Sequence, residues 1–388
     1  MAWEPGQPLA PVDALIENQS ARAEAVIPVR GCFRILYLYE VAEAIHLDRV
    51  RSLRESSRPE PPAGRVPPVP QYLRFERPPV SEPIEALKLE DGSRIAGSAK
   101  YYDYGVVSIE LELPFESEWD GLVLQSSLLI GSSELESSAS AWLRAALSRA
   151  RPALTKPYDS WLTEDYQITY LQDVAGPDHQ KLSAAELLSA RGSEIAQLVR
   201  GESVALSDVE RAEVLQSSLS YSQNDLLVVG WTGAVVYGSG EVAAATIQLL
   251  EYANTQLLEF RYYDGLLTNV LNSVYRFLEH KGGRFGDWRL SGESTRVNTI
   301  RLDVMELTEK VDNAIKFLSD MFYARLYNLI AAKVGVPDYR RLVEQKLRTA
   351  GELYRFMVDQ FNQARSFVLE LAIVVILVIE IVFLFRGK

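Results

Sequence analysis

The chain has 388 residues, 47% of them apolar and 24% charged, which is the composition of folded protein with sizeable hydrophobic cores. Its formal net charge is −12, and residues 1–238 hold 34 acidic but only 21 basic residues. Because such an acidic surface repels phosphate backbones, we expect no direct nucleic-acid partner. The single cysteine, Cys32, excludes an intramolecular disulfide.

After an N-terminal extension at 1–30, the pattern predicts an acidic α/β head over 31–238. Its first part alternates β-rich runs with helical spacing. We expect strands at 32–39, 71–76, 94–102, 105–113 and 165–173, and helices at 40–54 and across 117–150. This order predicts an α+β fold with a ferredoxin-like sandwich.

The remainder of the head has two helical patterns followed by short apolar runs. The helices are expected at 183–200 and 207–215, and the strands at 217–221, 226–230 and 234–237. These strands either complete the first sheet or form a second lobe, which would divide the head into 31–175 and 183–238.

From residue 239 to 365 the apolar residues recur with helical spacing, which predicts a long, antiparallel, coiled-coil-like stalk. Helices are expected at 241–280, from a cap at Ser294 or Thr295 to about 334, and from 339 into the terminal segment. The first helix has a dense polar patch. It consists of Glu251, Gln256, Glu259, Arg261 and Asp264. The patch is either a specific contact between helices or subunits, or a solvated face.

Residues 366–386 are predicted to form a single-pass transmembrane anchor. The run FVLELAIVVILVIEIVFLF at 367–385 would span about 28 Å as a helix. Arg365 can reach lipid headgroups at its start, whereas Glu370 and Glu380 either reach the interfaces or contact other copies of the helix. Because the N-terminus lacks a secretory signal, the head is expected in the cytoplasm. The alternative to a transmembrane anchor at 366–386 is a buried core helix.

Other motifs favour structural roles. The segment GSGEVA at 238–243 has the form of a dinucleotide fingerprint, but a long helix follows it in place of a second parallel strand. The three histidines, His46, His179 and His280, are too dispersed in sequence to predict a zinc site. No nucleophile motif or phosphate-binding loop is present. We therefore expect no catalytic residues, no metal and no cofactor, and no enzymatic activity.

Two segments resemble the C-terminal half of the required-for-meiotic-nuclear-division family, also called domain of unknown function 155. They are LLEYANTQLLEFRYYDGLL and ARSFVLELAIVVILVIEIVF, in which Arg365, Leu369, Glu370 and Glu380 match the family pattern. The resemblance implies a bacterial member that acts as a membrane-anchored, oligomeric scaffold without known enzymatic activity.

Together these features predict a tail-anchored scaffold or tether in a bacterial inner membrane. It would self-associate through its stalk and anchor and present the head to a cytoplasmic protein partner. One alternative is an ion channel or transport subunit with the layout of CorA-type channels, although their second membrane helix and Gly-Met-Asn loop are absent. A second alternative is a nucleotide-binding enzyme that uses the head.

Overall fold

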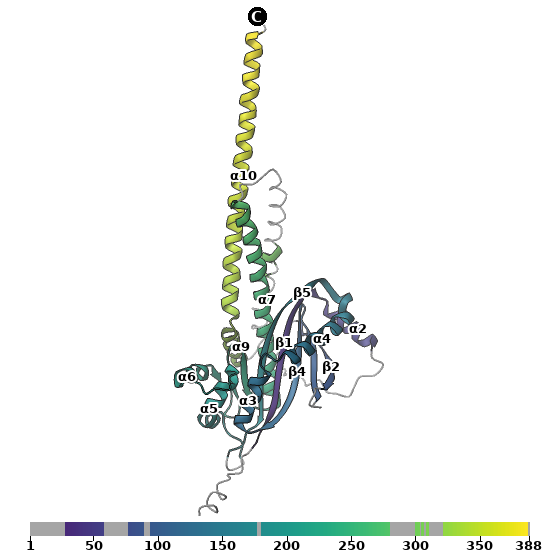
Figure 1. Ribbon diagram of the computed structural model, residues 1–388, viewed down its shortest axis with the longest axis vertical. Helices are drawn as coiled ribbons and strands as arrows, with labels where there is room; N and C mark the ends of the chain where they lie inside the picture. The colour runs from purple at the N-terminus through teal and green to yellow at the C-terminus, as the bar shows by residue number, and fades with distance from the viewer. Residues whose placement is uncertain are drawn as a thin grey trace, which may run out of the picture.

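The computed structural model describes residues 28–57, 77–88, 94–176, 180–279, 299–302, 304–305, 308–309 and 321–386. Its centre is one eight-stranded sheet with the order β2-β3-β4-β1-β5-β8-β7-β6 (Figure 1). The strands are β1 (Val29–Ile45), β2 (Val80–Lys88), β3 (Arg94–Tyr101), β4 (Val106–Ser117), β5 (Leu154–Asp173), β6 (Ser218–Leu219), β7 (Leu226–Val229) and β8 (Gly233–Tyr237). The sheet is mixed, because β5 and β8 are parallel while the other neighbours are antiparallel.

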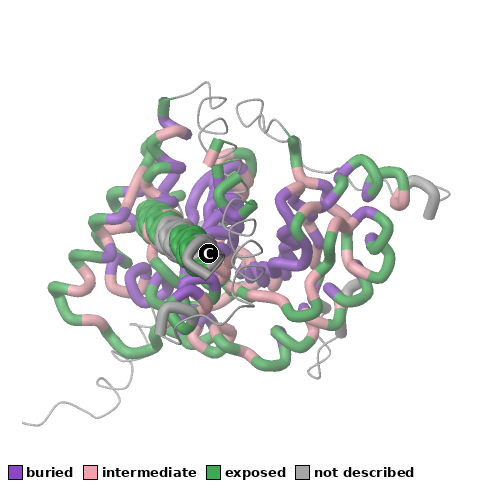
Figure 2. The backbone as a smooth tube through the Cα atoms, turned by 90° about the horizontal axis from the view of Figure 1, so that it is seen from above, coloured by how far each residue is buried: buried purple, intermediate pink, exposed green. Residues whose placement is uncertain are grey.

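Helices cover both faces of this sheet. They are α2 (Leu47–Ser57), α3 (Trp119–Leu129), α4 (Ser133–Ala150), α5 (Ala184–Arg200), α6 (Asp208–Gln216), α7 (Gly240–Glu279), α9 (Met321–Val334) and α10 (Val336–Arg386). The helices α7, α9 and α10 pack on one face, and α2 to α6 pack on the other. Seen from above, the buried residues fill the interior, while residues 373–379 of α10 are exposed (Figure 2).

The long strand β1 is buried on both faces because successive side chains of a strand alternate. Leu36 and Leu38 pack in the core beneath α7, and Ile35 and Tyr37 pack in the core beneath α4. The same alternation directs the even-numbered residues from Arg34 to Glu40 toward α7. It therefore places the charged side chains of Arg34 and Glu40 on that face of the sheet.

The expected ferredoxin-like head with a transmembrane helix is wrong. The parallel pairing of Gln167–Leu171 with Gly233–Tyr237 joins the later strands to the same sheet as the earlier ones. Residues 40–45 were expected to begin a helix, but they continue β1. The spacing of their apolar residues fits both a helix and a strand. Long-range backbone hydrogen bonds favour the strand, such as the bond from Val41 N to Gly105 O at 3.1 Å. The expected strand at 71–76 lies outside the described residues.

Several local predictions are confirmed. The hairpin forms as β3 and β4, and the helical stretch 117–150 forms α3 and α4, which separate at Gly131, where φ is +70°. The first stalk helix is α7, with 40 residues, and the terminal helix α10 has 51. The expected second stalk helix is described in part, and it ends as α9.

The expected anchor at 366–386 is contradicted. Among the helices that the structure describes, none is both long enough and apolar enough to cross a membrane. Two carboxylic residues, Glu370 and Glu380, interrupt the apolar run, and a carboxylate in hydrocarbon costs several kcal/mol. The expected tail-anchored class and the expected location in a bacterial inner membrane are overturned with the anchor.

Candidate functional site

The side of α7 that faces the sheet is polar and buried. Glu251, Thr255 and Glu259 follow one another at a spacing of four residues, so they share one helix face. Each of the three is at most 2% exposed, as are Asn254 and Gln256 on neighbouring faces. Buried carboxylates are stable only when they are paired or protonated. The contacts of Glu251 and Glu259 therefore define the interface between α7 and the sheet.

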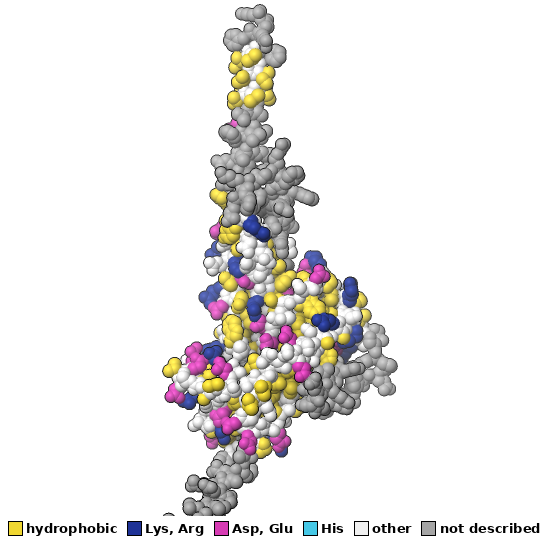
Figure 3. All heavy atoms as spheres, viewed as in Figure 1, with side chains coloured by type: hydrophobic (Ala, Val, Ile, Leu, Met, Phe, Trp, Pro, Cys, Tyr) yellow, Lys and Arg dark blue, Asp and Glu magenta, His cyan; other side chains and the backbone are white. Residues whose placement is uncertain are grey.

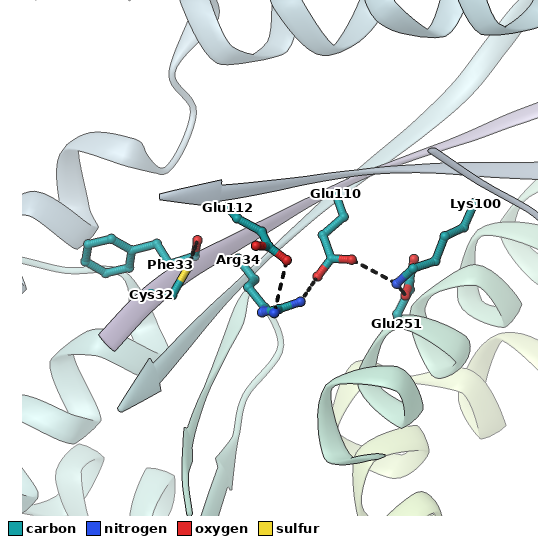
Figure 4. Close-up of polar contacts among 7 residues, drawn as sticks. All are labelled: Cys32, Phe33, Arg34, Lys100, Glu110, Glu112 and Glu251. Atoms are coloured by element: carbon teal, nitrogen blue, oxygen red, sulfur yellow. Dashed lines mark hydrogen bonds and ion pairs between the residues drawn. The ribbon is translucent and has the colours of Figure 1, made fainter. Parts of the chain in front are cut away.

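Glu251 ends a chain of charges that crosses the sheet (Figure 4). Arg34 donates to Glu110 at 2.5 Å and forms an ion pair with Glu112 at 3.0 Å. Lys100 donates to the other Glu110 oxygen at 2.8 Å and also to Glu251. Strand alternation places these side chains of β1, β3 and β4 on the face toward α7. The chain runs from Glu112, which is 40% exposed, to the fully buried Glu251.

The cations in this network keep Glu110 ionised. Burial raises the pKa of Glu110, but the charges and hydrogen bonds of Lys100 and Arg34 outweigh burial and lower the pKa to about 2. Burial lowers the pKa of Lys100, but Glu110 and Glu251 outweigh it and raise the pKa. Glu110 and Lys100 therefore stay charged at ordinary pH, and the ion pair of Lys100 with Glu251 joins β3 to α7.

A second pair of acids lies two helical turns further along α7. Glu40 of β1 is 1% exposed and lies against Glu259. Burial raises the pKa of Glu40 well above its usual value, and the charge and hydrogen bond of Glu259 raise it further. Burial also raises the pKa of the nearby Tyr158, as do a hydrogen bond with Tyr262 and the charges of both acids. Glu40 therefore keeps its proton to a higher pH than an exposed glutamic acid does.

The five polar residues predicted on the first stalk helix lie at contacts with five different elements. Glu251 contacts β3, Glu259 contacts β1 and Arg261 pairs with Glu164 of β5. Gln256 accepts a hydrogen bond from Tyr327 of α9, and Asp264 pairs with Lys346 of α10 at 2.6 Å. The alternative of a solvated face does not hold for Glu251, Gln256 and Glu259, since all three are buried.

Sequence reasoning missed the strand half of this interface. Arg34, Glu40, Lys100 and Glu110 each stand in a β-rich run beside apolar residues. A charge at every second position of a strand is typical of a solvated face, so these residues carried no sign of burial. The one sequence signal for their burial was indirect. The first stalk helix has polar residues on a face that would have to pack on the sheet, so the sheet needed polar partners there.

Cys32 lies on β1, two positions before Arg34. Burial raises the pKa of the Cys32 thiol to about 11, so the thiol is a poor nucleophile. Within the described part of the chain, no group of three or more His, Cys, Asp or Glu residues could hold a metal ion. In the GSGEVA segment, the carbonyl of Gly238 accepts a hydrogen bond from Tyr170 at 3.4 Å, and Asp225 packs against this glycine.

The far part of α10 is the other unusual feature of the molecule. The near part of α10 packs through Val336, Val343 and Ala350 against α7 and α9. Beyond it, the apolar residues 373–379 are each 48–58% exposed, and Glu370 is exposed as well. They form the apolar band near the end of the molecule (Figure 3). Arg365 and Glu380 belong to the same helix, but their side chains lie outside the described part.

Comparison with known proteins corrects the resemblance suggested above. A family model described as "Uncharacterized protein MJ0711, N-terminal domain" matches residues 30–243. Uncharacterized protein MJ0711 of Methanocaldococcus jannaschii is 21% identical over 219 residues, which are 56% of this chain and 65% of that protein. The chain thus spans about two thirds of that relative's length. No solved structure matches. The required-for-meiotic-nuclear-division assignment is wrong, because helical patterns of that kind arise in unrelated chains.

Proposed function

The chain belongs to the family of the MJ0711 N-terminal domain, and we propose that it acts as a self-associating scaffold. In this proposal, the far part of α10 binds the same segment of other copies. The head, which contains the eight-stranded sheet, is thereby displayed to a protein partner.

One observation carries this proposal: the exposed apolar run at 373–379 of α10. Seven consecutive residues cover nearly two turns, so apolar side chains are exposed on every side of the helix. Burying each CH₂ group of such side chains stabilises an assembly by about 0.8 kcal/mol. Exposed apolar patches that are contiguous mark interaction sites.

The occupant that fits this run is a second copy of the chain. The run lies past the end of α7, where Figure 1 shows α10 continuing alone, so bulky heads do not prevent the ends of several chains from meeting. A helix pair would cover only one side of each helix. Because all sides are apolar, we propose an assembly of three or more copies.

Sedimentation of the full-length chain tests the proposal. Ile376→Glu places a charge within the run and should convert the oligomer to monomer, whereas Val209→Glu should leave the mass unchanged. Val209 is a matched control because it is an exposed apolar residue on α6, 80% exposed. A monomeric wild-type chain that is instead taken up by lipid vesicles would contradict self-association. An oligomer unaffected by Ile376→Glu would do so too.

A further inference from the structure

The helix α3 has apolar side chains on the face that it turns away from the sheet. Its inner face is marked by Ser126, which is buried and accepts a hydrogen bond from Gln167 of β5 at 2.7 Å. On the outer face, Leu124 and Leu128 are 53% and 69% exposed, and their spacing of four residues places them side by side. The outer face of a surface helix is normally polar, so α3 is built like a helix that another element covers.

Acidic residues stand at both ends of this apolar face. Asp120 precedes Leu124 by four residues and is exposed on the same face. Glu134 is exposed in the first turn of α4, just after the turn that ends α3. Residues 118–136 include four acidic residues and no basic residue. The α3 surface is defined by Asp120, Leu124, Leu128 and Glu134.

One basic side chain reaches α3 from α5. The guanidinium carbon of Arg191 lies 5.6 Å from the centre of the Trp119 ring, and Arg191 pairs with Glu194 at 2.9 Å. Trp119 is buried, and the charge of Arg191 is matched within α5. The α3 surface therefore keeps a negative charge.

The charge of the α3 surface indicates what covers it. Specific interfaces join apolar residues at their centre and place opposite charges around them, so the partner should present apolar side chains flanked by Lys or Arg. Residues 1–27 of this chain precede β1, which begins near α3, where Val29 pairs with Ser117. Their charge does not fit, because they include four acidic residues and one basic residue.

We propose that the α3 surface binds a basic amphipathic helix of a separate protein. The apolar stripe of that helix covers Leu124 and Leu128, and its Lys or Arg side chains pair with Asp120 and Glu134. This inference rests on the proposed display of the head to a protein partner, and it names the surface and the chemistry of that partner. It does not depend on the contact between copies through α10, which lies on the other side of the sheet.

Binding of a labelled synthetic peptide to the full-length chain, followed by fluorescence anisotropy, tests this docking surface. The probe is a helical peptide of Leu and Lys whose leucines form one stripe. A peptide of the same composition, with its leucines distributed around the helix, is the control for charge alone. We expect the striped peptide to bind about tenfold more tightly than the control, which corresponds to burying roughly two more CH₂ groups.

Substitutions at exposed positions separate the apolar from the charged contribution. Leu124→Ser combined with Leu128→Ser should remove the preference for the striped peptide. Val209→Ser is the matched control, because Val209 is an exposed apolar residue of α6, and it should keep the preference. Asp120→Lys combined with Glu134→Lys should weaken the binding of both peptides and make it less dependent on salt.

Four outcomes would overturn the docking surface. They are the absence of binding, equal binding of the two peptides, an unchanged preference in the leucine variant, and an equal loss in Val209→Ser. Tighter binding after removal of residues 1–27 would identify that segment as the occupant, and it would overturn the assignment to a separate protein.

The variant Ile376→Glu distinguishes this inference from self-association. As a monomer it should bind the striped peptide as tightly as the wild type does. An oligomeric wild type that does not distinguish the two peptides would overturn the docking surface alone. A monomeric wild type that prefers the striped peptide would support the docking surface and contradict self-association.

Discussion

At the scale of single residues, Glu40 should make the protein less stable as the pH rises. Its pKa is raised in the folded state, so its contribution is fully present below the unfolded pKa of about 4.3 and is lost as the pH rises through the folded value. Glu40→Gln removes this loss. We expect it to raise the free energy of unfolding at pH 8 and to have little effect at pH 4, measured by urea denaturation. Destabilisation at pH 8 would contradict the account.

Glu110 should have the opposite dependence on pH. Its pKa is lowered to about 2, so its contribution is present above the unfolded value and is lost as the pH falls toward 2. Glu110→Gln leaves Lys100 and Arg34 without their shared carboxylate. We expect it to cost about 3–5 kcal/mol at pH 7, a deficit that shrinks in urea titrations at lower pH. The exposed Glu116, paired with Arg30, provides the control variant Glu116→Gln, which should change little.

Residues of this kind show where sequence reasoning ends. The polar residues of α7 were found because they stand out on an apolar helix. Their strand partners were not, because Lys100 and Glu110 are 151 and 141 positions from Glu251. Only the fold brings such distant residues together.

At the scale of elements, the turn between α9 and α10 sets the direction of α10. Gly335 has φ +92°, and a Cβ there would approach the ring of Trp231 to 2.7 Å. Gly335→Ala should therefore cost about 1–3 kcal/mol of stability, seen as a lower melting temperature. Gly351→Ala is its counterpart within α10, where a Cβ meets nothing within 4 Å. It should be neutral or stabilise by up to about 1 kcal/mol; equal effects of the two substitutions would contradict this explanation of the turn.

Element prediction succeeded where the pattern was local and failed where pairing was distant. The helices α7 and α10 follow from long runs of helical spacing, and the hairpin of β3 and β4 follows from a short turn. The helix expected at 40–54 begins only at Leu47, because pairing with β4 and β5 keeps residues 40–45 in β1. The parallel contact of β5 with β8, which makes one mixed sheet, joins residues 66 positions apart and has no local signal.

At the scale of the whole molecule, the protein has a head built on the eight-stranded sheet. A charged interface joins this sheet to α7. The helix α10, which packs on α7, extends beyond the rest of the molecule (Figure 1). The exposed run at 373–379 was recognised from the sequence as apolar, but its expected role as a membrane anchor is contradicted. Apolar content alone does not decide whether lipid or another protein segment covers a helix. The arrangement of exposed residues on every side of α10 is what favours an assembly of copies.

Site-specific crosslinking tests this claim most directly. With Cys32→Ser removing the natural thiol, Val378→Cys introduces a single thiol within the exposed run, and Val209→Cys introduces one on α6 as a control. A disulfide forms only when two cysteine Cα atoms come within about 7 Å. The account predicts rapid disulfide-linked dimers for Val378→Cys on mild oxidation and none for Val209→Cys. Absence of the Val378→Cys crosslink, or equal crosslinking at both positions, would contradict self-association through α10.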